Sequence, residues 1–500
     1  MAESGENDSA VLDPIVRGAI ERSVERVRST GQTRWLARVI DAEAVDGLRC
    51  YARAGMRDRF FWERVDADES LCAWGSVDEM ESSGPGRFHD VRVWATALRE
   101  RLDWVGVDRP TSAPTFVGGF GFEDEAMASA DWKAFPPARF VLPEVIVERW
   151  AGRARWVLFA RVEPGASVAS VERALASRRR DASRANAPAG DVPLVSVSDL
   201  EGPNDGQAGP EYIVRADRSH VVFKNQVRAA MREIEAGGLA KVVLARSLRV
   251  DHDAEVDVAG FLDRLRSLYP TCTLIAVGRA HDTFLAATPE TLVRVEGRDV
   301  ETAALGGSAP RGRSPDEDRR LGEGLLASEK ELGEHEHVVH ALREVLAPCC
   351  ETLDAPDTPR LCALFGIQHL ETAMRGRLRQ TDEAENSVDV LTLVEALHPT
   401  PAVGGVPAEA ARRWLRRFEG LERGWYAAPV GWLDVDGGGD FRVALRSALI
   451  RNGLGPRGES GASRALLFAG AGVVRQSEPE SELVETRIKL RALLAPLTEI

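Results

Sequence analysis

The fold class of this chain rests on KVVLARSLRV, residues 241–250, close to the middle of the sequence. Its run of valine, leucine and alanine, bounded by turn signals, predicts a buried β-strand. Upstream, apolar residues recur at helical spacing from 227 to 234, and the glycine pair at 237–238 ends that pattern. The segment therefore marks the start of a region in which helices and strands alternate.

The same alternation continues to the C-terminus. Apolar periodicity predicts helices, and β-branched runs predict strands joined by short turns. The further elements we expect are a helix at 258–268, strands at 273–278, 283–288 and 292–295, a helix beginning near Ser328, strands at 441–450 and 464–474, and a helix at 480–494. Strands joined by both short turns and helices predict an α+β fold with a large mixed, mostly antiparallel sheet.

The N-terminal half has weaker signals, with strand-like runs such as FVGGFGF (116–122) and ARWVLFARV (154–162). It has few clustered ionisable groups, so we interpret it as scaffold. A stretch rich in Gly, Pro, Asn and Asp at 183–210 predicts a long surface connection, and NGLGPRGESGAS at 452–463 predicts a long hairpin tip. The boundaries we expect are a disordered tail at 1–10, an N-terminal half at 11–205 and a C-terminal catalytic region at 206–500.

Composition limits the possible partners. The 500 residues carry a formal charge of −14, which argues against nucleic acid or an anionic membrane but allows a small anionic ligand in a basic pocket. No apolar run approaches the roughly 20 residues of a membrane helix, and no secretory segment opens the chain. The six cysteines lack a zinc-like spacing. We expect a cytoplasmic protein with reduced thiols.

Two charged residues lie where buried strands end. Lys241 opens an apolar strand, and desolvation there would make its amine a plausible general base. Glu290, in AATPETL, follows a strand and a proline-fixed turn, where a catalytic acid can reach a cavity. The alternative for both is an ordinary charged side chain at a strand end that points into water.

Glu334 falls on the core-facing side of a helix, because it precedes Val338 by four residues. A carboxylate there needs a cation or a strong donor, so metal ligation and a buried ion pair are both possible. A zinc site is disfavoured, because of the nearby histidines only His337 and His340 share a face and no further ligand completes the site.

The last helix places Glu482, Glu485 and Lys489 on one face. They form either a solvated stripe or an oxygen ligand set for a hard cation such as magnesium, with a lysine left to bind an anion. The preceding AGAGVV is not a GxGxxG fingerprint, so a nicotinamide dehydrogenase is disfavoured.

Two further segments, one rich in glycine and one in proline, also carry polar side chains. LGGSAPRG, residues 305–312, has the composition to grip a carboxylate, and LHPTPAVGG, residues 397–405, has prolines that imply a rigid loop. For both, an ordinary structural turn is the alternative.

Taken in order, these segments resemble the chorismate-utilising enzymes, the family of anthranilate, aminodeoxychorismate, salicylate and isochorismate synthases. The resemblance spans residues 223–490 almost continuously. The matching blocks are KVVLARSL, FLAATPETLV, TAALGGSAPRG, SEKELGEHEHVV, QHLET, LHPTPAVGGVP, WYAAPVGW, VALRSALI, FAGAGVV and SEPESELVETRIKL. Any one block alone would be weak evidence for this family, whereas the ordered set of blocks is highly specific to it.

Within that family HPTPAVGG is similar to the isochorismate synthase form of the loop. FVGGFGF and WKAFPPARFVLPE resemble the N-terminal half of bacterial isochorismate synthases of menaquinone and siderophore pathways. The resemblance implies one α/β sandwich around a deep site, with the connection at 183–210 as a surface loop inside one domain. No glutaminase domain with a Gly-x-Cys-x-Gly nucleophile is present in the sequence, so we expect no glutaminase subunit.

The resemblance also implies roles for individual residues. Lys241 matches the general base that activates water for attack at C2 of chorismate, and Glu290 matches the acid that protonates the departing C4 hydroxyl. Glu334 and Glu485 match magnesium ligands, with Glu482 acting through a metal-bound water, and His335 supports the metal ligand or faces the ring. The substrate-binding positions it implies are Gly307, Ser308, Thr400, Ala402, Arg446, Gly472 and Lys489.

These matches predict an isochorismate synthase, an isomerase that uses Mg²⁺ and chorismate. We expect a monomer, because no coiled coil or unusual apolar stripe appears in the sequence. A salicylate synthase and a non-catalytic chorismate-binding homologue are the alternatives. The sequence does not assign the product to menaquinone, siderophore or salicylate synthesis, and no role for the loop at 452–463 follows from it.

Overall fold

A computed structural model describes residues 13–106, 114–125, 129–150, 152–187, 212–364, 366–380, 388–453 and 461–498. Three expectations fall wholly or mostly outside these residues: the tail at 1–10, the connection at 183–210 and the hairpin tip at 452–463. The start of the connection was predicted wrongly, because residues 183–186 form the end of helix α4 (Val168–Asn186).

The larger sheet has 13 strands within the described part of the chain, and its path is antiparallel except where β1 and β5 run parallel. Its strands in spatial order are β10 (Tyr212–Ala216), β11 (Lys241–His252), β23 (Ser463–Val473), β22 (Ser447–Asn452), β13 (Asp282–Thr288), β12 (Thr273–Arg279), β2 (Arg59–Arg64), β3 (Glu69–Trp74), β8 (Val145–Trp150), β9 (Arg153–Val162), β1 (Arg34–Ala42) and β5 (Leu102–Gly106), with the short β19 (Gly405–Val406) paired to β11.

The second sheet has 10 strands among the described residues and is antiparallel throughout. Its order is β16 (Cys350–Asp354), β18 (Ile367–Leu378), β15 (Asp299–Pro310), β14 (Thr291–Glu296), β21 (Gly439–Val443), β20 (Pro429–Leu433), β6 (Phe116–Phe120), β7 (Ala138–Leu142) and β4 (Asp78–Ser82), with β17 (Arg360–Ala363) paired to β18.

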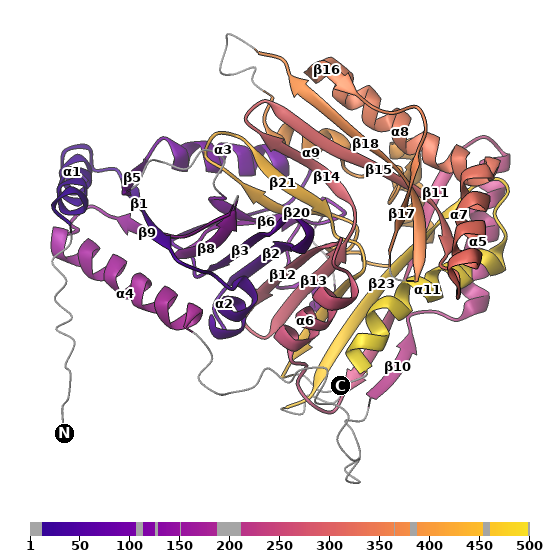
Figure 1. Ribbon diagram of the computed structural model, residues 1–500, viewed down its shortest axis with the longest axis horizontal. Coiled ribbons are helices and arrows are strands. Elements are labelled where there is room, and N and C mark those ends of the chain that lie inside the picture. The colour runs from indigo at the N-terminus through magenta and orange to yellow at the C-terminus, as the bar shows by residue number, and fades with distance from the viewer. Residues whose placement is uncertain are drawn as a thin grey trace.

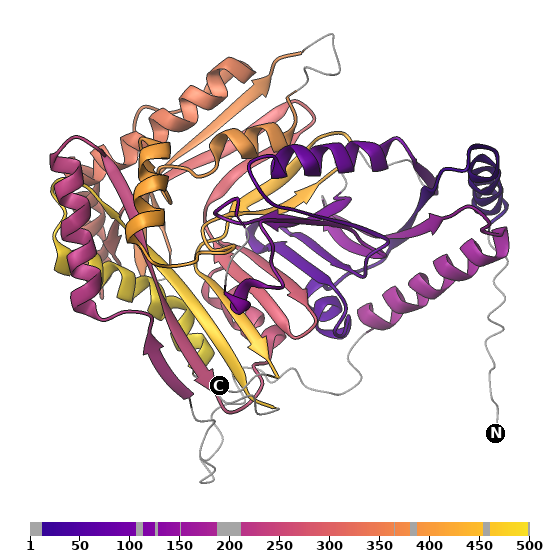
Figure 2. The same ribbon diagram turned by 180° about the vertical axis from the view of Figure 1, so that it is seen from behind.

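Helices cover the outer faces of the sheets (Figures 1 and 2). They are α1 (Pro14–Thr30), α2 (Gly47–Arg53), α3 (Arg87–Arg99), α4 (Val168–Asn186), α5 (His220–Glu235), α6 (Val258–Leu268), α7 (Pro315–Ala327), α8 (Glu329–Cys349), α9 (Val390–Leu397), α10 (Ala408–Phe418) and α11 (Pro479–Thr498), with 3₁₀ turns η1 (Val65–Ala67) and η2 (Ala130–Trp132). The predicted helix start near Ser328 is confirmed, because the Ser328 side chain caps α8 by accepting a hydrogen bond from the Glu331 amide.

Strands from the two halves of the chain are interleaved in both sheets. In the larger sheet β2 pairs with β12, and in the smaller one β6 pairs with β20. On the outside, α2 and α6 from the two halves lie side by side (Figure 1). The expected α+β sandwich with mostly antiparallel sheets is therefore confirmed, while the boundary at 205/206 stays a prediction.

The core has two layers, because successive side chains of a strand point to opposite faces. On β2, Trp62 points between the sheets and packs edge-on against Trp432 of β20, with ring centroids 6.4 Å apart. Its neighbour Phe61 points outward into the layer under the helices, where Leu265 of α6 and Leu493 of α11 are also buried. Because of this alternation, each strand contributes side chains both to the packing between the sheets and to the packing against the helices.

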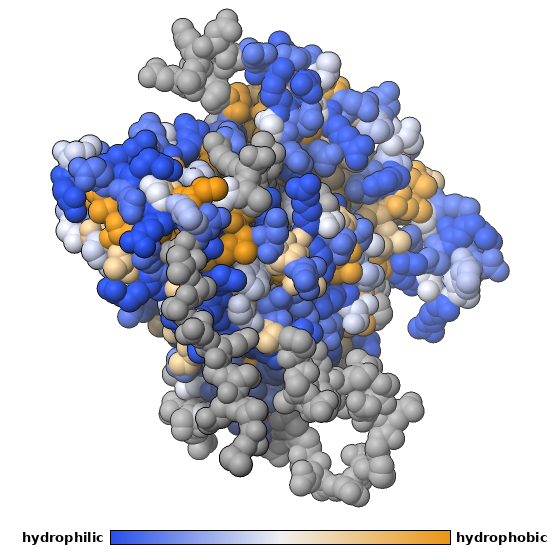
Figure 3. All heavy atoms as spheres, turned by 60° about the vertical axis from the view of Figure 1, so that its left-hand side comes forward, coloured by the Kyte–Doolittle hydropathy of each residue, from blue (hydrophilic) through white to orange (hydrophobic). Residues whose placement is uncertain are grey.

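The outer surface seen from the side of α1 and α4 is mainly hydrophilic, with scattered apolar residues (Figure 3). Among the described residues, no helix combines the length and apolar character that crossing a bilayer requires.

Candidate active site

A cavity of about 90 Å³ lies where strands of both sheets meet α8 and α11. Strands β11 and β23 of the larger sheet form one part of its wall, and β15 and β18 of the smaller sheet form another. Turns before β14 and β22 and the loop before β19 complete it. Residues more than two hundred positions apart in sequence thus line one cavity.

Lys241 is the first residue of β11, and its side chain is only 1% exposed. Its Nζ lies 2.9 Å from Oε1 of Glu334 on α8. Burial opposes ionisation of Glu334, but the nearby lysine amines, Lys241 first among them, outweigh it and lower the pKa of Glu334. Gly472 on β23 leaves room for this pair, since an added Cβ would collide with the Glu334 carboxylate.

Glu290 lies in the turn between β13 and β14 and is 3% exposed. Burial raises the pKa of Glu290 to about 7, although Lys241 and a hydrogen bond from Thr400 oppose that rise. The Thr400 Oγ1 donor lies 3.5 Å from Glu290 Oε1. A carboxyl group that keeps its proton to near neutral pH has the property a general acid needs.

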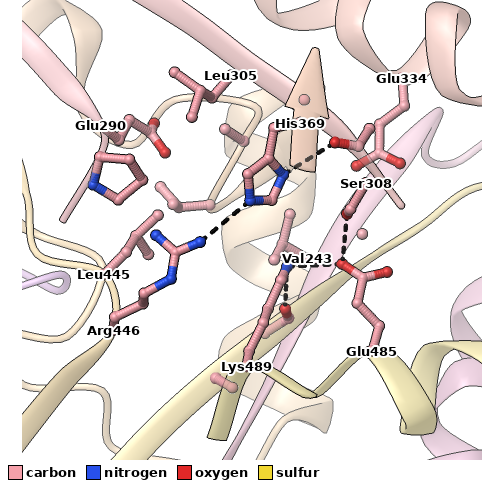
Figure 4. Close-up of a pocket in the computed structure, with 18 of the residues that line it drawn as sticks. Val243, Glu290, Leu305, Ser308, Glu334, His369, Leu445, Arg446, Glu485 and Lys489 are labelled. Carbon is pink, nitrogen blue, oxygen red and sulfur yellow. Dashed lines mark hydrogen bonds and ion pairs between the residues drawn. The ribbon is translucent and has the colours of Figure 1, made fainter. Parts of the chain in front are cut away.

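Four carboxylates, those of Glu331, Glu334, Glu482 and Glu485, form an acidic cluster by their mutual electrostatic influence. Of these, Glu334 and Glu485 line the cavity on the side away from Glu290 (Figure 4). Burial and the charge of Glu485 raise the pKa of Glu482 to about 7, and burial and the charge of Glu334 raise the pKa of Glu331. The Nζ of Lys330 lies 3.4 Å from carboxylate oxygens of both Glu331 and Glu482. Such mutual repulsion between carboxylates can be relieved by protons or by a cation.

A cationic side of the cavity is built around Arg446 and His369. The His369 ring lies 3.1 Å from the Gly307 carbonyl through Nδ1 and 3.3 Å from Arg446 Nη2 through Nε2. Burial and the charge of Arg446 lower the pKa of His369 to about 3, so the ring is neutral, donates from Nδ1 and accepts from Arg446. Figure 4 shows Glu290 and Arg446 on one side of the cavity and Glu334, Ser308 and Glu485 on the other.

A second cation, Lys489 of α11, is held in place from two directions. Its Nζ donates to the Gly470 carbonyl at 3.0 Å and lies 2.7 Å from Glu485 Oε1. Ser308 Oγ donates to the same carboxylate oxygen at 3.1 Å, as Figure 4 shows. The cavity therefore offers Lys489 and Arg446 as two separate positive charges for an anionic ligand.

Most of the residues expected from the sequence surround this one cavity. Those that line it are Lys241, Glu290, Gly307, Ser308, Glu334, Ala402, Arg446, Gly472, Glu485 and Lys489. Thr400 lies behind its wall and contacts Glu290, and Glu482 lies behind Glu485 and contacts Lys330.

Two details differ from expectation. His335 does not line the cavity: one residue after Glu334 the helix has turned by about 100°, and the His335 Nε2 pairs with Thr372 Oγ1 at 2.8 Å. The alternative given for LGGSAPRG, an ordinary turn, is wrong, because its first six residues belong to strand β15, with an irregularity between Gly306 and Ser308. Gly307 there has φ +64°, a conformation that favours glycine and that aims Ser308 at Glu485.

Sequence reasoning missed several lining residues. They are Leu305, His369, Val403, Tyr426, Leu445 and Phe468. His369 and Tyr426 stood inside the quoted blocks QHLET and WYAAPVGW, which could have drawn attention to them. The four apolar residues also stood inside quoted blocks, but an apolar side chain is usually part of the core, so nothing singled them out as lining a site.

Comparison with known proteins agrees with this geometry. A protein-family model described as "Chorismate binding enzyme" matches residues 22–498, and the chain belongs to that family. The salicylate biosynthesis isochorismate synthase of Pseudomonas aeruginosa is 34% identical over 491 residues, 97% of this chain and 94% of that protein. The isochorismate synthase MenF of Bacillus subtilis is 30% identical, over 91% and 92% of the two chains. Within the family the chain therefore groups with the isochorismate synthases, enzymes of the isomerase class.

A solved structure shows the same fold. The menaquinone-specific isochorismate synthase MenF of Escherichia coli superimposes with a TM-score of 0.71, covering 96% of this chain and 100% of that one at 24% identity. The expected sandwich architecture of this family is thus confirmed.

Proposed function

We propose that this protein converts chorismate to isochorismate by adding water at C2 of the ring and releasing the C4 hydroxyl. The observation that carries the proposal is the single cavity that brings Lys241 and Glu290 together with the carboxylates of Glu334 and Glu485. The names of the relatives and the match to the chorismate-binding family support the choice of substrate.

The reaction needs a base and an acid at different atoms of one ring. Lys241, in its neutral form, takes a proton from water as the water oxygen bonds to C2. Both conjugated ring double bonds shift by one position toward C4, the C4–O bond breaks, and Glu290 gives its proton to the departing hydroxide, which leaves as water. Glu290 suits this role because its pKa of about 7 keeps much of it protonated near neutral pH.

The substrate carries two carboxylates, and the cavity holds groups that can bind them. Arg446, oriented by His369, and Lys489, held by Gly470 and Glu485, are cationic donors that line the wall. Ser308 adds a hydroxyl beside them. Binding both ends of the substrate would fix the ring between Lys241 and Glu290.

We also propose that Mg²⁺ is bound by Glu334 and Glu485, with Glu482 behind them. Carboxylate oxygens are the ligands that this hard cation prefers, and the repulsion within the acidic cluster favours its binding. In the described part of the chain no three His, Cys, Asp or Glu side chains are already gathered for a metal; Glu334 and Glu485 are turned to Lys241 and Lys489 instead. Both carboxylates would have to exchange a lysine for the cation. When bound, the ion supplies a positive charge that anchors and orients a substrate carboxylate.

The test is to incubate the purified protein with chorismate and Mg²⁺ and to separate the products by chromatography. We expect isochorismate as the principal product. Salicylate as the principal product would show that the site also eliminates pyruvate. Anthranilate, in a parallel incubation with an ammonium salt as nitrogen source, would show an ammonia-using enzyme. Either result contradicts the proposal. No consumption of chorismate would point to a non-catalytic binding protein.

The monomeric state and the absence of a glutaminase subunit stay predictions. The mass of the active protein in solution checks both.

A further inference from the structure

Strand pairing is interrupted along one edge of β11, next to the cavity. On one edge, β23 pairs with β11 from Val242 to His252, all of the strand except Lys241. On the other edge, β19 pairs only at 241–242 and β10 pairs only at 248–252. Within the described chain no strand pairs with residues 243–247 there, and the backbone groups in such a gap need other partners.

Backbone contacts close the two ends of this gap: the Val243 amide donates to the Gly404 carbonyl at 2.9 Å, and the Asp217 amide donates to the Ser247 carbonyl at 3.1 Å. Two buried side chains fill the space between them. Arg423 donates from Nη2 to the Val243 carbonyl at 2.7 Å and from Nη1 to the Val403 carbonyl at 2.7 Å. Arg423 also binds both carboxylate oxygens of Glu419, at 2.8 and 2.6 Å. Glu419 Oε1 in turn accepts a hydrogen bond from the Ala245 amide at 2.7 Å. The pair thus takes the place of a strand, satisfying the carbonyl of Val243 and the amide of Ala245.

Only an arginine fits this arrangement. Its planar guanidinium presents several donors in fixed directions, so a single side chain reaches two carbonyls and a carboxylate at once. The guanidinium also lies over the ring of Phe122, 4.2 Å from its centroid. Both Arg423 and Glu419 are 3% exposed, so neither charge has water to replace a lost partner.

The two carbonyls that Arg423 joins belong to opposite parts of the site. Val243 lines the cavity two residues after Lys241 on β11. Val403 lies in the loop that carries Thr400, and the Val403 amide donates to the Thr400 carbonyl at 3.1 Å. Thr400 then contacts Glu290. A continuous path of contacts therefore runs from the strand of Lys241, through Arg423 and the loop, to Glu290.

We propose that Arg423, held by Glu419, is a positioning residue that fixes the loop of Thr400 against the strand of Lys241 and so sets the spacing of the base and the acid. This inference rests on the function proposed above. Arg423 does not line the cavity and would act only through the segments that it joins.

The groups suited to bind the substrate are held independently of Arg423. Arg446, Ser308 and Lys489, the groups suited to hold the substrate carboxylates, come from the turn before β22, from β15 and from α11. Within the part of the chain that the structure describes, no hydrogen bond joins any of them to Arg423 or Glu419; their partners are Glu485, His369 and Gly470. Loss of the bridge should therefore lower kcat with little change in KM, because misplacing reacting groups by about 1 Å can cost about 100-fold in rate.

The experiment compares Arg423→Lys with Arg139→Lys, a matched control. Arg139 is also a buried arginine, 5% exposed, and it binds Asp58, Glu79 and Glu81, none of which lines the cavity. A lysine keeps the charge but cannot span two carbonyls. We expect both variants to lower Tm, and we expect only Arg423→Lys to lower kcat, by about 10- to 100-fold, with KM nearly unchanged.

A second variant, Glu419→Gln, keeps an acceptor for the Ala245 amide and leaves both carbonyl contacts of Arg423 possible. Its loss of kcat should be smaller than that of Arg423→Lys. An equal loss, an unchanged kcat in Arg423→Lys, or an equal fall in kcat in Arg139→Lys would overturn the positioning role. Consumption of chorismate is followed whichever product forms: no consumption by the unaltered protein refutes the proposed function and this inference with it, whereas consumption that Arg423→Lys leaves intact refutes this inference alone.

Discussion

Replacing Glu290 by glutamine removes the proposed acid while keeping the size of the side chain and a partner for the Thr400 hydroxyl, 3.5 Å away. An amide cannot supply the proton that the leaving hydroxyl needs. Because general acid catalysis contributes about 10²- to 10⁴-fold, kcat of Glu290→Gln should fall by that order.

The same substitution should stabilise the protein at neutral and alkaline pH. Burial raises the pKa of Glu290 from 4.5 to about 7. Below pH 4.5 the carboxyl is protonated in both the folded and the unfolded chain, so there is no penalty. Between pH 4.5 and 7 the unfolded chain ionises first, and folding stability falls by about 1.4 kcal/mol for each unit of the shift, or about 3 kcal/mol in total. Glutamine does not titrate and escapes this loss.

Two measurements test the reasoning together: the rate of chorismate consumption, and the Tm of both proteins from pH 4.5 to pH 8. The Tm of Glu290→Gln relative to the unaltered protein should rise with pH across this window. Glu148→Gln is the control, because Glu148 is also fully buried, its pKa is also raised by burial, and it lies outside the cavity. Its turnover should be unchanged. Normal turnover by Glu290→Gln, or a Tm difference that does not grow with pH, would refute the assignment of a buried, protonated acid at this position.

The remaining predictions concern the proposed base Lys241, the metal ion and Gly472 beside Glu334. Lys241→Ala should abolish turnover but leave chorismate binding, measured by calorimetry, nearly intact; a variant with normal turnover would remove this lysine from the mechanism. A chelator should abolish activity and added Mg²⁺ restore it, and Glu334→Gln should weaken Mg²⁺ binding in a direct titration, whereas activity that survives complete chelation would count against the metal. Gly472→Ala should lower kcat/KM by about 10-fold or more, since its Cβ would collide with the Glu334 carboxylate. Gly324→Ala is the control for it, because an added Cβ there meets nothing within 4 Å, and equal rates for the two alanine variants would contradict the crowding argument.

Much of the fold could be predicted from local pattern. Strand β11, the helix start at Ser328 and the pairing of β22 with β23 follow from apolar periodicity and turn residues, which act over a few neighbours. The run at 441–450, predicted as one strand, is instead divided between β21 and β22, which belong to different sheets. The pairing of β2 with β12 could not be predicted in this way, because nothing in either strand specifies a partner about two hundred residues away.

The candidate site also has features that the sequence predicts and features that depend on tertiary packing. The sequence by itself determined which groups are available: the amine of Lys241, the carboxyls of Glu290, Glu334 and Glu485, and a pattern of blocks that identifies the family. Only the tertiary structure decided that Glu334 faces Lys241 while His335 turns away, and that burial raises the pKa of Glu290 to about 7. It alone placed Arg423 in the gap of β11. Desolvation, ion pairing and edge contacts depend on which distant segments are packed together, and a linear pattern carries no record of that packing.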